Sequence, residues 1–100
     1  MKITKNKIIK IQKLCKNNKV KSLFAFGSVT RDDFKENSDI DLIIDINEDD
    51  PFKYTDIYFY LKLNFEKLLN RPIDLLEKRA LKNKIFINEV ENTKVKIYEH

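Results

Sequence analysis

Apolar residues recur along this chain in two rhythms, which predict helices and strands in turn. Over residues 4 to about 18 they return every three or four positions among lysines, which predicts a surface helix with one buried stripe. The stripe consists of Ile8, Ile11, Leu14 and Cys15. The next segment, Val20–Phe26, is rich in apolar and aromatic residues and ends at Gly27, the only glycine of the chain. It predicts a buried strand that runs into a tight turn.

Strict alternation marks residues 39–46. Successive side chains of a strand point to opposite faces, so every second residue shares a face. One face of this segment is apolar, and the other carries two carboxylates near its start. The apolar positions are Ile40, Leu42, Ile44 and Ile46, and the acidic ones are Asp39 and Asp41. The pattern predicts a second strand with an acidic end.

The second half of the chain continues the alternation of helices and strands. A polar turn at residues 47–51 precedes a long helix that ends near Asn70. The buried stripe expected for this helix consists of Ile57, Leu61, Phe65 and Leu68. Residues 72–76 predict a short strand around Asp74, residues 80 to about 92 a helix, and residues 95–98 a last strand. This order predicts an α/β (α+β) domain with a small mixed β-sheet flanked by helices.

Length and composition narrow the class of protein. One hundred residues suit a single domain, 1–100, and 42% hydrophobic with 36% charged residues is typical of a soluble globular protein. No segment approaches the roughly 20 apolar residues of a membrane span, and the basic N-terminus lacks the apolar stretch of a signal peptide. We therefore expect a cytoplasmic protein without membrane contact. Because Cys15 is the only cysteine, we expect neither a disulfide within the chain nor a thiolate zinc site.

The net charge of +4 is a weak indication of a nucleic-acid partner. It comes from 17 lysines scattered along the chain and only three arginines. A dedicated nucleic-acid surface concentrates its basic residues in a patch or stripe. The scatter favours a biased composition or a heat-adapted surface, so direct nucleic-acid binding is not expected.

The two carboxylates of the alternating strand are the first candidate site. On one face of a strand, Asp39 and Asp41 would have Cα atoms about 6.5–7 Å apart, close enough to share hard cations through oxygen. Mg²⁺ suits such a pair because it completes its shell with water and substrate phosphates. If the strand of Asp74 lies beside this one, a third carboxylate allows two Mg²⁺ ions about 3.5–4 Å apart. Alternatively, Asp74 faces water on an exposed sheet face.

The turn after the first strand is the second candidate site. Glycine at position 27 lets backbone N–H groups approach a phosphate, and the hydroxyl of Ser28 adds a donor. If Ser28 opens a short helix through Asp33, the free amides at its start and the side chain of Arg31 would also face the phosphate. A simple turn and a solvated surface arginine are the alternatives.

These residues together resemble a known signature. Gly27 and Ser28, then ten residues, then Asp39, Ile40 and Asp41 are similar to the motif of the DNA polymerase beta nucleotidyltransferase superfamily. The segments around them, residues 26–31 and 38–42, resemble its minimal nucleotidyltransferase branch in particular. That branch has about this length, begins with a helix and carries its third acid on a later strand, where Asp74 stands. The resemblance implies a polymerase-beta-like nucleotidyltransferase fold.

The resemblance also implies a function and a partner. Members of that branch are antitoxins that pair with a HEPN-domain toxin and transfer AMP from ATP onto a tyrosine of it. Gly27 and Ser28 would then bind the nucleotide phosphates, and Asp39 and Asp41 would bind magnesium. Asp74 would complete the metal site and assist the attacking hydroxyl.

Two further hypotheses stay open. The chain could be a binding module that neutralises a partner by contact alone, since Tyr54, Tyr58 and Tyr60 on the long helix suit either packing or a partner interface. Transfer to RNA or to a small molecule is the third hypothesis, although no appended recognition domain is expected in 100 residues. The nucleotide preference, the number of nucleotides transferred and the oligomeric state have no readable motif.

Overall fold

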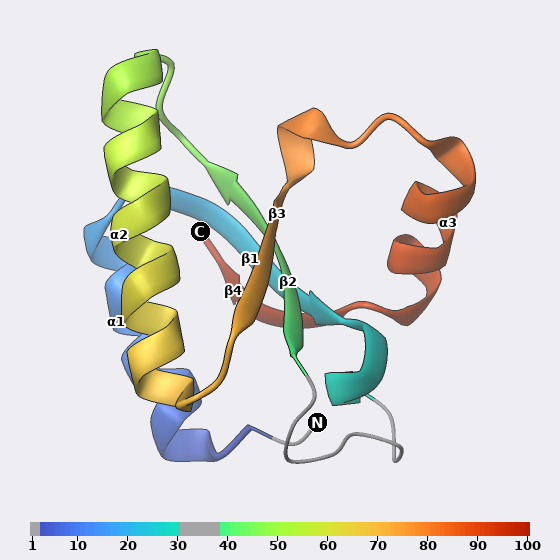
Figure 1. The fold of residues 1–100 in the computed structure, drawn as a ribbon, viewed down its shortest axis with the longest axis horizontal. Coiled ribbons are helices and arrows are strands. Elements are labelled where there is room, and N and C mark those ends of the chain that lie inside the picture. The colour runs from blue at the N-terminus through green and yellow to red at the C-terminus, as the bar shows by residue number, and fades with distance from the viewer. Residues whose placement is uncertain (1–2, 31–38) are drawn as a thin grey trace.

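Helices and strands alternate along the chain in the order that its apolar pattern predicts (Figure 1). The computed structural model describes residues 3–30 and 39–100. The elements in this part of the chain are α1 (Lys5–Asn17), β1 (Val20–Phe26), the 3₁₀ turn η1 (Gly27–Thr30), β2 (Ile40–Ile46), α2 (Pro51–Leu69), β3 (Ile73–Glu77), the 3₁₀ turn η2 (Lys78–Ala80), α3 (Lys84–Thr93) and β4 (Val95–Glu99). The predicted α/β class and all seven predicted elements are confirmed.

Side-chain caps define where the first two helices begin. The hydroxyl of Thr4 accepts a hydrogen bond from the backbone N–H of Lys7, 3.4 Å away, at the start of α1. At the start of α2, the carboxylate of Asp50 accepts from two backbone N–H groups, and Pro51 occupies the first helical position. Proline fits there because the first N–H of a helix has no partner within the helix. Helix α2 ends at Leu69, and the capping residue Asn70 has a φ of 55°, the left-handed conformation common after a helix.

The third helix begins later than the sequence predicts. We expected it from Ala80, but residues 78–80 form the 3₁₀ turn η2 and α3 starts at Lys84. The reason is the cap: the side-chain oxygen of Asn83 accepts from the N–H groups of Ile85 and Phe86, at 3.0 and 3.2 Å. An asparagine at this position fixes the first turn of a helix by satisfying amides that have no other partner.

The four strands form one mixed sheet in the order β3-β2-β1-β4. Strand β1 pairs antiparallel with β2 on one side and with β4 on the other. Strand β3 lies at the edge and runs parallel to β2, to which α2 connects it. The predicted small mixed sheet is therefore confirmed.

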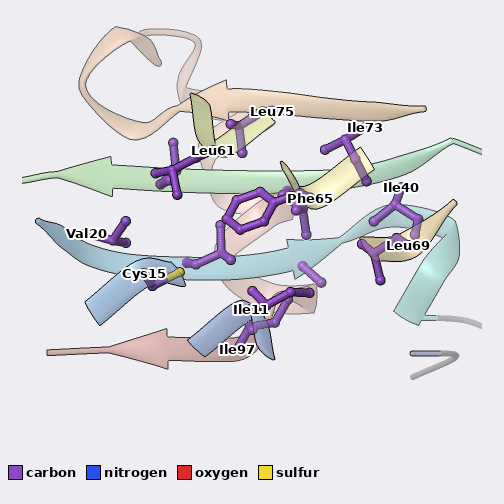
Figure 2. Packing of buried hydrophobic residues seen from close by; sticks show 14 of the residues in the cluster. Ile11, Cys15, Val20, Ile40, Leu61, Phe65, Leu69, Ile73, Leu75 and Ile97 are labelled. Carbon is purple, nitrogen blue, oxygen red and sulfur yellow. The ribbon is translucent and has the colours of Figure 1, made fainter. Parts of the chain in front are cut away.

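The two faces of the sheet are covered differently. Figure 1 shows α1 and α2 together on one side, with α3 separate from them on the other. The face under α1 and α2 holds the larger cluster, in which Cys15, Leu61 and Phe65 are fully buried against the strands (Figure 2). The face under α3 holds a small cluster centred on Phe26, Ile43 and Val90. Ile43 is buried although it shares a face with the acids, because α3 covers that part of the sheet.

The buried stripe of α2 differs slightly from the predicted one. Leu61 and Phe65 are buried as expected, whereas Ile57 and Leu68 only border the core. Tyr54 and Leu69 are buried in their place. The buried positions of α2 are spaced by seven, four and four residues, so Tyr54, two turns before Leu61, faces the sheet.

The tyrosines of α2 divide between packing and exposure. Tyr54 is buried, with the guanidinium of Arg79 4.1 Å from the centre of its ring. The hydroxyl of Tyr58 donates a hydrogen bond to the carbonyl oxygen of Leu75, 2.5 Å away, which ties α2 to β3. Burial and the negative charges of Glu77 and Asp74 raise the pKa of Tyr58, so the hydroxyl keeps the proton that it donates. Tyr60 is exposed.

None of the helices in residues 3–30 and 39–100 combines the length and the apolar character that crossing a bilayer requires.

Candidate active site

Strand β2 carries Asp41, as the alternation predicts, but it begins at Ile40, one residue later than the predicted strand, so Asp39 lies just outside it. Asp39 is exposed and stands immediately before the first strand residue, Ile40. Asp41 lies within the strand and is half-buried. Ile40 and Leu42 are buried against α1 and α2, so the side chain of Asp41 points to the opposite face, toward the side of α3.

Asp74 lies beside Asp41, which sequence alone left open. In the parallel pairing of β2 with β3, Asp41 and Asp74 are register partners. Neighbouring strands lie about 4.8 Å apart, and partner residues point to the same face. The exposed Asp74 therefore belongs to the face that carries Asp41, at the edge of the sheet.

Gly27 lies against the carboxylate of Asp41. Its φ of +73° is a conformation that side chains other than glycine rarely adopt. A Cβ at this position would lie 2.6 Å from Oδ2 of Asp41, closer than such atoms can approach. The turn is held from two sides, because the hydroxyl of Thr30 donates to the carbonyl oxygen of Gly27 at 2.7 Å and Val29 is fully buried in the larger core cluster. The open space of a glycine is thus needed where the turn meets the acids.

The other turn residues are described only in part. Ser28 lies in η1, which runs from Gly27 to Thr30 and forms part of the short helix that we expected. Arg31, the predicted phosphate contact, and Asp33, the predicted end of that helix, lie outside the described residues.

The carboxylates suit a hard cation by their chemistry and position. Carboxylate oxygens are the ligands that Mg²⁺ prefers, and Oδ2 of Asp41 lies close against the Gly27 turn. Across residues 3–30 and 39–100, no three acidic, histidine or cysteine side chains are close enough together to form a complete metal site. A cation held here would therefore need further ligands such as water and phosphate oxygens, which is usual for Mg²⁺.

A hollow of about 510 Å³ opens next to the Gly27 turn on the side of α3. Its lining residues are Phe26, Gly27, Phe86, Glu89, Val90, Asn92 and Thr93. A larger hollow, about 600 Å³, lies at the other end of β1 and is lined by residues that include Lys16, Lys19 and Lys21. The apolar pattern of the sequence indicates none of the α3 residues of the first hollow, because an aromatic residue in an amphipathic helix indicates only packing.

Residues 9–100 match the model of the polymerase beta nucleotidyltransferase family. The chain belongs to this family. It is accordingly a nucleotidyltransferase with the polymerase-beta-like fold, and the resemblance found in the sequence is confirmed.

Relatives agree with this assignment. A Methanocaldococcus jannaschii protein named "Putative protein adenylyltransferase MJ1215" is 38% identical over 71 residues, which cover 70% of this chain and 78% of the relative. A solved structure of a "putative minimal nucleotidyltransferase" is 26% identical and covers 90% of this chain and 88% of its own, with a TM-score of 0.75. A chain from the structure of a tri-AMPylated Shewanella oneidensis HEPN toxin in complex with an MNT antitoxin shares the fold, with a TM-score of 0.67 at 19% identity, covering 98% of this chain and 74% of that one.

Proposed function

We propose that this nucleotidyltransferase transfers AMP from ATP onto a tyrosine hydroxyl of a HEPN-domain toxin and thereby acts as its antitoxin in the cytoplasm. The observation that carries the proposal is the parallel register that sets Asp74 beside Asp41, with the Gly27 turn against Asp41. An adenylyltransferase name among the relatives and a toxin–antitoxin complex among the structures with the same fold support the reaction and the partner.

The reaction is a displacement at the α-phosphorus of ATP. The oxygen of the acceptor hydroxyl forms a bond to that phosphorus, the bond from the phosphorus to the oxygen bridging to the β-phosphate breaks, and pyrophosphate leaves. The carboxylate of Asp74, exposed at the sheet edge, accepts the proton of the hydroxyl. The amides and hydroxyl of the turn at Gly27 and Ser28, with Arg31, bind and orient the phosphates.

Asp39, Asp41 and Asp74 would hold Mg²⁺, as one or two ions. When bound, the metal supplies positive charge that neutralises the phosphate oxygens as negative charge develops on them. The protein's own part is to set Asp74 beside Asp41, two like charges whose proximity is unfavourable without a cation between them.

Transfer of label from ATP to the partner tests the proposal. The purified protein is incubated with a HEPN partner, magnesium and ATP that carries label at either the α- or the γ-phosphate. We expect α-label and no γ-label on the partner. We expect the α-label to be lost when a chelator removes the magnesium and in the Asp39→Asn/Asp41→Asn variant. Asp45→Asn is the matched control, because Asp45 is a half-buried acid on β2 that is four residues further along the same face.

Each outcome assigns a different chemistry. Transfer of γ-label would show that the protein is a kinase. Transfer of α-label by the Asp39→Asn/Asp41→Asn variant would show that neither acid is needed for the reaction. A Tyr→Phe series in the partner, followed by mass spectrometry of the AMP adduct, identifies the accepting tyrosine.

One observation favours neutralisation by contact as a second function. Phe52, Phe59 and Leu63 lie on one line of α2 and are 84%, 61% and 53% exposed, so a large apolar stripe faces away from the core. If contact alone neutralised the toxin, the Asp39→Asn/Asp41→Asn variant would still rescue growth of cells that express it. Under the proposed reaction, that variant fails to rescue growth although it still binds the toxin.

A further inference from the structure

The hollow beside the Gly27 turn has one apolar wall and a polar rim. Strand β1 contributes its end at Phe26, and α3 contributes Phe86 together with Glu89, Asn92 and Thr93 along its remaining turns. Helix α3 also contacts η1 directly, so the hollow is bounded by the same turn that lies against Asp41. A volume of about 510 Å³ lies within the range of small-molecule sites, roughly 300–1,000 Å³.

The ring of Phe86 is held in place at this hollow. It packs edge-to-face against Phe26, with ring centres 5.8 Å apart and planes at 81°. Its backbone N–H donates to the side chain of Asn83 in the helix cap, which fixes the first turn of α3. Phe86 is only half-buried, so part of a fixed aromatic ring borders the hollow.

We infer that this hollow receives the nucleoside of the donor nucleotide, with a purine base stacked on Phe86. The inference rests on the proposed function, which sets the α-phosphate at Asp41. Gly27 lies against Asp41 and also lines the hollow, so the hollow begins beside this phosphate. Within the hollow, Phe86 supplies a flat apolar surface of the kind on which bases stack. The polar rim offers hydrogen-bonding groups, among them the amide of Asn92, to the edge of the base.

The lysine-lined hollow is too far from the acids to serve the same nucleotide. It borders Val20, the first residue of β1, whereas Gly27 follows the last. A strand rises about 3.3 Å per residue, so the seven residues of β1 separate the two hollows by roughly 20 Å. A nucleotide with its α-phosphate at Asp41 therefore does not extend into the lysine-lined hollow, whereas the hollow at Phe86 begins at the turn that lies against Asp41.

Binding measurements separate the base from the phosphates. Dissociation constants in the presence of Mg²⁺, without any partner, are measured for ATP, CTP, ribose 5′-triphosphate and inorganic tripolyphosphate. For the wild type we expect the order ATP, then CTP, then the two ligands without a base. Phe86→Leu weakens ATP binding roughly five- to hundredfold, the range for loss of one base–aromatic stack, and leaves tripolyphosphate binding unchanged.

Two variants control for the fold and for the ring. Phe86→Tyr keeps an aromatic surface and is expected to bind ATP as the wild type does. Ile85→Ala removes the neighbouring apolar side chain of α3, which is 77% exposed and does not line the hollow, and is expected to change no dissociation constant.

The wild type alone can overturn the inference. If ATP and ribose 5′-triphosphate bind with equal affinity, the base makes no contact, and the inference fails whether or not AMP transfer is observed. Equal loss of ATP and tripolyphosphate binding in Phe86→Leu also overturns it, because stacking cannot act on a ligand without a base. Conversely, base-dependent binding through Phe86 without label on the partner supports the inference while the proposed function fails.

Discussion

The two faces of the sheet use the same strands for opposite purposes. Under α1 and α2, every strand contributes buried apolar residues to one continuous cluster. Under α3, the cluster is small, and Asp41 and Asp74 stand beside it. Strand β2 shows the contrast within a few residues, because Ile40 and Leu42 bury into the first face while Asp41 between them belongs to the second.

This difference indicates how a small domain tolerates a group of like charges. Carboxylates close together destabilise a fold unless a cation or solvent compensates them. Here one face supplies most of the apolar burial, so the other can hold residues selected for chemistry. Stability and the candidate site should therefore respond to different substitutions, and five experiments test that separation.

The largest effect is expected from Asp74→Asn. Loss of the carboxylate that we propose as the proton acceptor should lower AMP transfer about 10²–10⁴-fold, while the melting temperature stays within a degree or two because Asp74 is exposed. Initial rates of α-label transfer and a thermal melt check both. Glu77→Gln at the other end of β3 is the control. An unchanged rate of AMP transfer would support the alternative that Asp74 only faces water on an exposed sheet face.

Phe65→Ala should act on the other face and mainly on stability. Phe65 is fully buried in the larger cluster, so its truncation should lower the free energy of unfolding by about 3–5 kcal/mol. Phe59→Ala, on the exposed side of the same helix, should cost little. Denaturant titration measures the free energy of unfolding of both variants.

Alkylation of the Cys15 thiol measures how far the larger cluster opens to solvent. Burial raises the pKa of Cys15 from an ordinary 9.0 to about 12, so the folded protein should resist alkylation at pH 8 and lose stability as the pH rises from 9 toward 12. Phe65→Ala should make Cys15 reactive at pH 8. Slow alkylation in that variant would mean that the cluster closes around the cavity.

Gly27→Ala should affect the site more than the fold. The positive φ alone costs roughly 1–2 kcal/mol for a residue with a Cβ, and the new Cβ would push the carboxylate of Asp41 from its place. A displacement of about 1 Å at a reacting centre can cost about a hundredfold in rate. Asn70→Ala is the matched control, since Asn70 also has a positive φ but ends α2. Equal rates in the two variants would contradict the close contact of Gly27 with Asp41.

The smallest effect is expected from the helix caps. Asn83→Ala and Asp50→Ala should each cost about 1 kcal/mol, but in different places. Loss of the Asp50 cap should lower the stability of the whole molecule, because α2 covers the larger cluster. Loss of the Asn83 cap should speed hydrogen exchange mainly in α3. Exchange measured residue by residue distinguishes a global from a local change, and equal patterns would argue against the separation of the two faces.

Most of the secondary structure could be predicted because it follows from local pattern. Two such patterns are the alternation at residues 39–46 and the helical spacing of Ile11 and Cys15. Both can be recognised without knowing which distant residues they contact. The start of α3 was placed too early, because the apolar pattern does not show that Asn83 would cap the helix. The rotation of α2 that buries Tyr54 was missed because it depends on what α2 packs against.

The sequence by itself determined the order of the elements, the apolar face of β2 with Asp41 on the opposite face, and the glycine at the end of β1. These depend on the geometry of one strand and one turn, which neighbouring residues decide. Only the tertiary structure decided that β3 lies parallel to β2 with Asp74 beside Asp41, and that α3 brings Phe86 to the Gly27 turn. Both arise from contacts between segments more than 30 residues apart, where many pairings satisfy the same local pattern and packing of the whole sheet selects one.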